Sequence, residues 1–383
     1  MIPFDYEQRT RFVYGPNRID ELGSLAKELS ATKALLCTDP GIVKAGHAER
    51  AVKSLASAGI AVEVFDGVRE NPDTADVDRA LAVAKSISPN LLIGLGGGSS
   101  MDCAKGVNFL FTNGGQIKDY WGVGKATKPM LPMIAAPTTA GTGSEAQSFA
   151  LISDAQTHVK MACGDKKAAC RIAILDPTLT VSQPKRVTAL TGIDAIAHAL
   201  ETYVTRPRNA ISLAFSREAW TLLSENFEKV LATPDDLTAR GEMQLGACFA
   251  GMAIENSMLG ATHALANPLT ADYDVPHGQA IAIMLPHVVR FNGRQVARWY
   301  AELSIPGEGP LAGGSEADHV EKLAQFLEKI VRESGLVTRL ADSGVESTKL
   351  EKLAEDAGKQ WTAKFNPREA ATTDFAAIYR NAF

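Results

Sequence analysis

The feature that most constrains the fold is a change of pattern along the chain. In the first half, short β-rich apolar runs alternate with segments whose apolar residues recur at helical spacing. We expect strands within residues 33–39, 61–68, 90–100, 130–145 and 171–177, a hairpin within 148–163, and helices within 47–60, 74–88 and 101–113. This alternation predicts an α/β domain with a parallel sheet wrapped by helices.

The alternation stops near residue 185. From about residue 187 onward the apolar residues recur at helical spacing over long stretches, such as VTALTGIDAIAHALETYVT, and β-branched runs between turns largely disappear. A chain of 383 residues also exceeds the size at which one hydrophobic core usually suffices. We therefore expect two domains, an α/β domain over residues 1–185 and an all-α domain over residues 186–383.

The bulk composition is that of a soluble globular protein and argues against two classes of partner. The net charge of −5 gives no basic surface for nucleic acid. No apolar run reaches the roughly 18–20 residues that a membrane span needs. The charged N-terminal residues MIPFDYEQRTRF lack the apolar core of a signal peptide, and the five cysteines include no CxxC pair. We therefore expect reduced thiols and a cytoplasmic protein.

A run of glycines follows one of the expected strands. The stretch GLGGGSSMDCAK (94–105) lies between a predicted strand and a predicted helix. Glycines let the backbone approach a phosphate closely, and a helix N-terminus presents free N–H groups to it. The stretch matches neither the GxGxxG dinucleotide motif nor the P-loop motif. Two interpretations stay open: a phosphate-binding loop, which we favour, and a tight turn that simply requires glycine.

Two further strand ends carry side chains that suit a dinucleotide. Asp39 closes the first expected strand, where a carboxylate suits ribose hydroxyls, but Pro40 and Gly41 follow and an Asx-turn explains it equally well. The loop PTTAGTGSE (137–145) offers threonine hydroxyls at the end of another strand, where ligands of open α/β sheets collect. Each single threonine is equally well explained as a turn residue.

In the helical half, TGIDAIAHALE (191–201) places a carboxylate and an imidazole in an apolar segment. Asp194 and His198 are four residues apart, so a helix brings them to one face, and a buried carboxylate needs a partner or a metal. His263 and His277 follow in apolar or Gly/Pro-rich surroundings. One carboxylate with three imidazoles suits Fe(II) or Zn(II), the alternative being satisfied core histidines. Three histidines in polar surroundings are expected at the surface: His47, His158 and His319.

Four segments together resemble a known family. In chain order, GGGSSMDCAK, PTTAGTGSE, TGIDAIAHALE and GATHALANPL…VPHG are similar to motifs of the iron-containing (group III) alcohol dehydrogenases, within the wider dehydroquinate-synthase-like group. The resemblance covers nearly the whole chain. It implies an N-terminal dinucleotide-binding α/β domain and a C-terminal helical domain for the metal and the substrate.

The resemblance also implies the roles of individual residues. The family's metal ligands fall on Asp194, His198, His263 and His277. Many members carry a histidine four residues after the third ligand, where this chain has Asn267, which donates a hydrogen bond but relays no proton. We expect Asn267 to play a supporting part. The candidate cofactor-binding residues, to which we add Asp102 of the glycine-rich segment, are Asp39, Asn71, Gly97, Gly98, Ser99, Asp102, Thr138, Thr139, Thr142 and Lys160.

The implied function is metal-dependent hydride transfer. A metal, Fe²⁺ or alternatively Zn²⁺, polarises the oxygen of a small alcohol, aldehyde or ketone, and NAD(H) accepts or gives the hydride. We also expect a homodimer or a larger homo-oligomer. Three alternatives stay open: another superfamily enzyme of glycerol dehydrogenase or dehydroquinate synthase type, a maleylacetate reductase-like enzyme without metal, and a non-catalytic dinucleotide-binding sensor. The complete ligand set argues against the last two.

Overall fold

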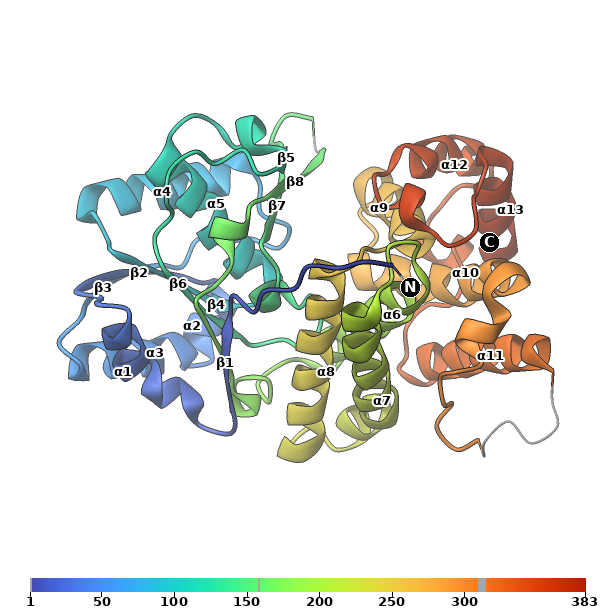
Figure 1. Ribbon diagram of the computed structural model, residues 1–383, viewed down its shortest axis with the longest axis horizontal. Coiled ribbons are helices and arrows are strands. Elements are labelled where there is room, and N and C mark those ends of the chain that lie inside the picture. Colours follow the sequence, from blue (N-terminus) through green and yellow to red (C-terminus); the bar gives the residue numbers. More distant parts are fainter. Residues whose placement is uncertain (1, 158, 309–314) are drawn as a thin grey trace. The chain divides into compact units, whose positions relative to one another are not determined.

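The structure is a computed structural model that describes residues 2–157, 159–308 and 315–383. The chain divides into two compact units (Figure 1). One spans Glu7–Gln183 and is called the α/β unit below. The other comprises Pro184–Phe383 with the N-terminal segment up to Tyr6 and is called the helical unit.

A six-stranded sheet forms the centre of the α/β unit. In spatial order its strands are β1 (Arg11–Tyr14), β9 (Ile172–Leu175), β6 (Met133–Pro137), β4 (Leu91–Gly96), β2 (Lys33–Cys37) and β3 (Ala61–Phe65). Every neighbouring pair is parallel, which confirms the predicted parallel sheet. Because β3 and β4 lie on opposite sides of β2, the chain leaves β2 and β4 in opposite directions, and such a switch point is where α/β sheets bind ligands.

Helices cover both faces of this sheet. They are α1 (Leu22–Glu28), α2 (Pro40–Lys44), α3 (His47–Ser57), α4 (Thr74–Ile87) and α5 (Gly98–Asn113). Consecutive strand residues point to opposite faces, so Leu36 and Ile93 share one core cluster with α1 and α3, whereas Leu35 and Leu92 share the other with α4 and α5. The expected helix after the glycine run begins earlier than predicted, at Gly98 and inside that run.

A smaller sheet of three strands belongs to the same unit. Its strands, in spatial order, are β5 (Gly122–Val123), β8 (Lys160–Gly164) and β7 (Phe149–Ser153). β7 and β8 are antiparallel, which agrees with the hairpin expected within residues 148–163. Lys160, one of the candidate cofactor-binding residues, is therefore the first residue of β8.

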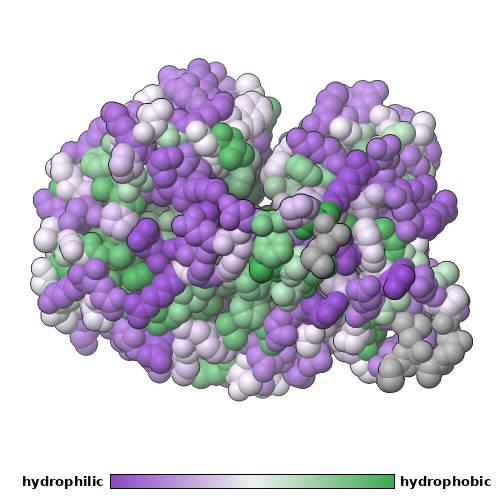
Figure 2. Space-filling view, in the orientation of Figure 1, coloured by the Kyte–Doolittle hydropathy of each residue, from purple (hydrophilic) through white to green (hydrophobic). Residues whose placement is uncertain are grey.

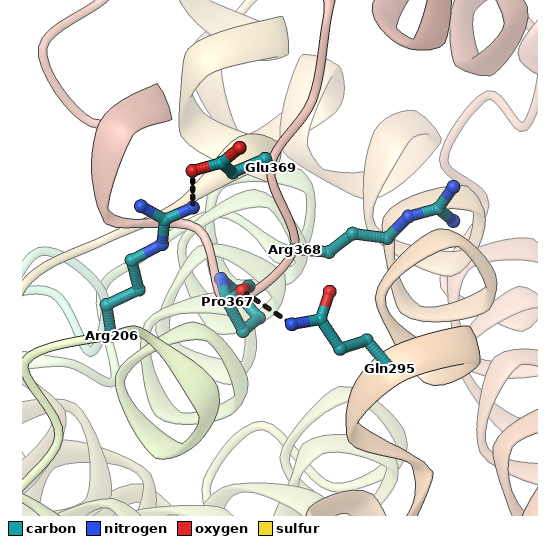
Figure 3. A pocket seen from close by; sticks show the side chains of 5 residues that line it. All are labelled: Arg206, Gln295, Pro367, Arg368 and Glu369. Carbon is teal, nitrogen blue, oxygen red and sulfur yellow. Dashed lines mark hydrogen bonds and ion pairs between the residues drawn. The ribbon is translucent and has the colours of Figure 1, made fainter.

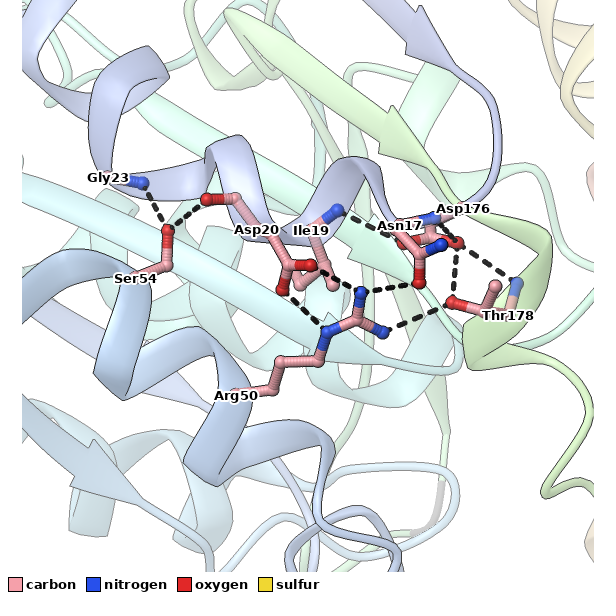
Figure 4. Close-up of polar contacts among 8 residues, drawn as sticks. All are labelled: Asn17, Ile19, Asp20, Gly23, Arg50, Ser54, Asp176 and Thr178. Carbon is pink, nitrogen blue, oxygen red and sulfur yellow. Dashed lines mark hydrogen bonds and ion pairs between the residues drawn. The ribbon is translucent and has the colours of Figure 1, made fainter.

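A polar network fastens the start of the α/β unit to the end of β9 (Figure 4). Asp176 is fully buried and accepts hydrogen bonds from the backbone N–H groups of Asn17 and Ile19, at 3.0 and 3.1 Å. Arg50 on α3 donates to both carboxylate oxygens of Asp20 and to the side-chain oxygen of Asn17. These contacts give the buried carboxylate its partners and hold α3 beside the segment after β1.

The helical unit confirms the predicted all-α architecture, since its described residues contain no strand. Its helices are α6 (Lys185–Val204), α7 (Ala210–Ala232), α8 (Leu237–Glu255), α9 (Ala261–Tyr273), α10 (His277–Tyr300), α11 (Glu316–Glu333), α12 (Leu350–Lys359) and α13 (Thr372–Ala382). α6 packs against α7, α8 and α10, and every residue from Gly192 to Val204 is buried. Polar side chains on this stretch of α6 must therefore find partners inside the protein.

The described helices include no candidate for a membrane span. Hydrophilic side chains predominate on the face shown in Figure 2, with hydrophobic ones exposed in small groups. None of the described helices combines the length and the hydropathy that a bilayer span requires.

Candidate functional site

Three helices of the helical unit bring one carboxylate and three imidazoles together. Asp194 and His198 lie one turn apart on α6, and each is only 5% exposed. His263 lies in the first turn of α9, and His277 is the first residue of α10. From Asp194 Oδ1, the Nε2 atoms of His198 and His263 are each 3.4 Å away, and that of His277 is 3.6 Å away. Three of the four predicted metal-ligating residues, the histidines, therefore surround a carboxylate oxygen of the fourth.

The spacing of these atoms fits a bound cation. Ligand atoms arranged tetrahedrally at about 2.1 Å from an ion lie about 3.4 Å from one another. The candidate ligand atoms of Asp194, His263 and His277 all lie within 4.8 Å of each other. Asp194 Oδ1 and His263 Nε2 are buried and have no hydrogen-bond partner among the described residues. Such atoms are costly to bury unless a ligand joins them, so the cluster fits a divalent metal.

The charges of the cluster favour a cation. Burial raises the pKa of Asp194, but the neighbouring imidazoles, His198 above all, outweigh burial and hold that pKa well below its usual range. Burial lowers the pKa of His263, but the carboxylates of Glu201 and Asp194 outweigh it and raise the pKa to about 9. The two carboxylates therefore favour a positive charge at His263, which a proton or a metal ion can supply. Metal binding here is expected to release a proton.

In the α/β unit, candidate cofactor-binding residues from three segments lie at one edge of the six-stranded sheet. Asp39, Gly97 and Thr138 follow the carboxyl ends of β2, β4 and β6, which are neighbouring parallel strands. The loops after β2 and β4 flank the switch point of the sheet. This is the edge at which open α/β sheets bind nucleotides.

The glycine run and the threonine loop are in direct contact. A Cβ atom added to Gly98 would lie 2.7 Å from Thr142 Cγ2, and one added to Gly97 would lie 3.4 Å from Thr139 Cγ2. The N–H of Thr138 donates to the carbonyl of Gly96 at 2.9 Å, and Gly96 itself has φ +148°, a conformation that favours glycine. The glycines therefore have a structural reason as well as the predicted phosphate-binding one, and both interpretations stay compatible with the structure.

A second polar group lies beside the start of α5. Lys160 Nζ donates to Asn71 Oδ1 at 3.3 Å, and the N–H of Asn71 donates to Ser99 Oγ at 3.2 Å. Asn71 has φ +51°, which asparagine tolerates better than most residues. Three candidate residues from separate segments, at positions 71, 99 and 160, thus meet next to the helix N-terminus, where an anion is favoured.

Asp39 has two contacts that bear on its alternative explanations. Its Oδ1 accepts from the N–H groups of Gly41 and Ile42 at 2.8 and 3.1 Å, so Asp39 caps α2, much as the Asx-turn explanation requires. Its Oδ2 lies 3.4 Å from the position of a Cβ on Gly96, beside the glycine run. Capping uses Oδ1 alone, so it is compatible with the ribose binding predicted from the sequence. Asp102, in contrast, is 6% exposed, and burial raises its pKa to about 6.

Comparison with known proteins identifies the family. The model of the iron-containing alcohol dehydrogenases matches residues 9–177, and the model of the C-terminal region of Fe-containing alcohol dehydrogenases matches residues 188–383. The chain belongs to the iron-containing alcohol dehydrogenase family. It is therefore an oxidoreductase, and the resemblance seen in the four sequence segments is confirmed.

Relatives match this alcohol dehydrogenase family member over its full length. A 1,3-propanediol dehydrogenase of Klebsiella pneumoniae is 35% identical, with 99% of each chain covered. An NAD-dependent methanol dehydrogenase of Bacillus methanolicus is 35% identical, with 97% of each chain covered. A crystal structure of a 1,3-propanediol oxidoreductase matches with a TM-score of 0.96 at 36% identity, covering 100% of both chains.

Two buried charged residues of this family member have contacts that sequence reasoning missed. Glu201 shares the face of Asp194 and His198 on α6, and its carboxylate contacts His263 Nδ1 at 2.5 Å. Lys105 on α5 is fully buried, and its Nζ donates to three backbone carbonyls, two in the loop after β6 and one at the first residue of β7. Sequence spacing places Glu201 on the face of Asp194 and His198, but it does not reveal the contact with His263. No local sequence pattern indicates that Lys105 is buried.

Asn267 lies one turn after His263 on α9 and is half-buried. Its Nδ2 donates to Gln360 Oε1 at 3.0 Å, so its amide is tied to the C-terminal end of α12. The contact gives Asn267 a structural role. Its supporting part in the reaction stays a prediction.

A surface cavity of the helical unit lies apart from the candidate ligands. It has a volume of about 440 Å³ and is lined by Arg206, Gln295, Pro367, Arg368 and Glu369. Arg206 pairs with Glu369 at 3.2 Å, and Figure 3 shows the guanidinium group of Arg368 turned away from that pair. The guanidinium groups of Arg206 and Arg368 do not converge on one point of the cavity, and none of the proposed metal ligands lines the cavity.

Proposed function

We propose that the protein interconverts a small alcohol and its aldehyde or ketone by hydride transfer with NAD(H), using a divalent metal. The observation that carries the proposal is the Asp194-centred cluster, in which three imidazole nitrogens lie 3.4–3.6 Å from one buried carboxylate oxygen. The names of two full-length relatives, a 1,3-propanediol dehydrogenase and an NAD-dependent methanol dehydrogenase, support small alcohols and NAD(H).

The proposed ligands are Asp194, His198, His263 and His277. A divalent cation supplies Lewis-acid polarisation of a substrate oxygen, and the nicotinamide supplies the hydride acceptor or donor. Asp194 contributes the only negative charge among the four proposed ligands, and the carboxylate of Glu201 contacts the ligand His263 from the other side of its ring. We propose Fe²⁺, in keeping with the family's description, with Zn²⁺ as the alternative, because one carboxylate and three imidazoles suit both ions.

The side chains divide the remaining work. Burial of Asp194 and His263 strengthens the electrostatic interactions of these side chains. Asn267 is a hydrogen-bond donor without an acid–base function at neutral pH, so we propose no protein base at that position. The proposed coenzyme contacts are the ten candidate residues of the α/β unit, with the ribose at Asp39 and the pyrophosphate at Gly97–Ser99.

We also propose a homo-oligomer and a cytoplasmic location. β1 is an edge strand of the six-stranded sheet, and Tyr14 on it is 42% exposed, a surface that a second copy would cover. The five cysteines are all buried as free thiols, which suits a reducing compartment. Sedimentation of the purified protein would test the first of these proposals.

The decisive experiment combines metal analysis with turnover. Protein purified anaerobically should carry about one iron per chain and oxidise NADH with a panel of short aldehydes. His263→Ala and His277→Ala should lose most of the metal and at least about a hundredfold in kcat/KM, since a Lewis acid contributes several kcal/mol. His287→Ala is the matched control, because His287 lies on the same helix as His277 but outside the cluster. Full metal content and turnover in either ligand variant would refute the assignment.

A further inference from the structure

Glu201 is a carboxylate buried inside the helical unit, and no part of the proposed reaction uses it directly. It lies on α6, three residues after His198 and seven after Asp194, so it shares their face of the helix. The residue is 3% exposed. A carboxylate in such a place is costly unless donors surround it, so its contacts should explain why it is there.

Both oxygens of Glu201 face α9. Oε1 accepts the N–H of Thr262 at 2.6 Å, and Oε2 contacts His263 Nδ1 at 2.5 Å. Thr262 and His263 lie in the first turn of α9, where backbone N–H groups lack partners within the helix and a negative charge is favoured. Gly260 permits this approach, because a Cβ there would lie 3.2 Å from Oε1. Glu201 thus holds the start of α9 and the imidazole at once.

The contact also decides which nitrogen of His263 is protonated. A carboxylate accepts hydrogen bonds, so Nδ1 must carry the hydrogen that faces Glu201. In the neutral ring the lone pair is then on Nε2, the atom that lies 3.4 Å from Asp194 Oδ1. The nitrogen that faces the cluster is therefore the one that can ligate a metal.

We propose that Glu201 is a positioning residue for the metal: it fixes the ring orientation and the tautomer of His263 so that Nε2 is presented to the cation. This inference rests on the proposed role of His263 as a ligand. Partners of this kind orient ligating imidazoles, and their removal typically costs about 10–100-fold in metal affinity.

Glu201→Gln tests the inference with little change of shape. The two donors on α9 need two acceptors, and a glutamine amide offers one oxygen and one NH₂ group. Either the Thr262 N–H loses its partner, or the imidazole must turn Nδ1 into an acceptor and direct Nε2–H at the cluster. We expect the dissociation constant for Zn²⁺, measured on the metal-free protein by competition with a chelating indicator, to rise about 10–100-fold. Glu201→Asp keeps the charge, and its dissociation constant for Zn²⁺ should lie between those of the wild type and Glu201→Gln.

The matched control is Glu302→Gln. Glu302 also accepts a hydrogen bond from a residue of α6, the Tyr203 hydroxyl at 2.6 Å, but it is not part of the cluster. This variant should bind Zn²⁺ with wild-type affinity. Wild-type affinity in folded Glu201→Gln, alongside loss of metal in His263→Ala, would overturn the positioning role alone. Metal retained by His263→Ala would overturn the ligand assignment instead.

A crystal structure of the zinc-loaded wild-type protein tests the inference even if the variants do not fold. Zinc on Nε2 of His263, with Nδ1 within hydrogen-bond distance of Glu201, supports it. Zinc on Nδ1, or Glu201 itself turned onto the ion, contradicts it.

Discussion

The two candidate sites of this protein are built from different parts of the chain. In the helical unit the polar atoms belong to side chains, which α6, α9 and α10 bring within 3.6 Å of Asp194 Oδ1. In the α/β unit the candidate site is largely backbone, at the ends of β2, β4 and β6, lined by glycines and threonines. A site made of side chains is lost with one ligand. A site made of backbone should tolerate single changes while its loops keep their shape.

Each site nevertheless contains one buried charge that braces it. Glu201 accepts two hydrogen bonds from the start of α9. Lys105 has the opposite charge and donates to the carbonyls of Ser144, Gln147 and Phe149 at 2.6, 2.7 and 3.0 Å. The carboxylate of Glu201 accepts hydrogen bonds at a helix N-terminus, whereas the ammonium group of Lys105 donates hydrogen bonds to backbone carbonyls between β6 and β7 and at the start of β7. The comparison predicts that the backbone-built site depends on Lys105 more than on any single threonine.

Lys105→Met should have the largest effect on the α/β unit. Methionine keeps most of the apolar stem but leaves three carbonyls without their donor, so we expect the free energy of unfolding to fall by about 3–5 kcal/mol. Denaturant unfolding and NADH titration would measure the loss of stability and of coenzyme affinity. Arg11→Met is the control, because Arg11 and its partner Glu28 are both exposed and such a pair should contribute less than about 1 kcal/mol. Equal effects of the two changes would show that Lys105 is no brace.

Glu145→Gln should alter how stability depends on pH. Burial raises the pKa of Glu145 to about 7. The pKa of Glu145 in the unfolded chain is near 4.5, so between this pH and pH 7 the folded protein holds a proton that the unfolded chain has released. The free energy of unfolding therefore falls as the pH rises through this range. Glutamine lacks the titration, and the variant should therefore gain up to about 3 kcal/mol relative to the wild type across this range.

Unfolding measured at pH 4.5 and pH 8 gives the difference directly. Exposed Glu49 provides the control, since Glu49→Gln should show no such change. A pH-independent difference between wild type and Glu145→Gln would mean that the carboxyl is charged in the folded state. The buried ammonium group of Lys105 would then have a buried carboxylate, that of Glu145, in the same unit.

The contrast between the two sites also explains what could be predicted from the sequence. Helical spacing links Asp194 to His198, and the family resemblance adds His263 and His277, so the four residues that meet in the structure could be named from the sequence, while metal binding by them stays a prediction. Strand–helix alternation predicted the sheet, but β1 was missed, because four residues paired only with distant β9 leave little local pattern. The partners of Glu201 and Lys105 lie 39 to 62 residues away in the chain, beyond any local pattern.

Burial was the least predictable property. His47 and His319 were expected at the surface, but their exposed fractions are only 9% and 7%. His47 contacts the Ser182 hydroxyl at 2.8 Å, a residue far along the chain, so polar sequence neighbours misled the prediction. His158 lies outside the described residues. A polar neighbourhood in sequence predicts exposure only where the fold brings nothing else against it.

Asp39→Gly tests whether the Asp39 side chain sets the preference of the α/β site for NADH over NADPH. A carboxylate at the adenosine ribose favours NADH and repels the 2′-phosphate of NADPH, so NADH should exceed NADPH at least about tenfold in kcat/KM. The variant should narrow or reverse this ratio. Asp39→Asn is the sharper comparison, because its side-chain oxygen can still cap α2 while the charge is gone. Equal use of both coenzymes by the wild type would place Asp39 away from the ribose and leave capping as its role.

Asn267→Ala should have the smallest effect, although Asn267 lies on the same helix as a proposed ligand. The variant loses the hydrogen bond of 3.0 Å to Gln360, and one such bond contributes about 1 kcal/mol, so turnover should fall less than about tenfold. Gln360→Ala removes the same bond from the other side. If the bond is all that matters, both variants should lose the same modest factor and keep the same pH profile. A far larger loss in Asn267→Ala alone would mean that its amide contacts the substrate or the coenzyme, and the side-chain site would then extend one turn beyond His263.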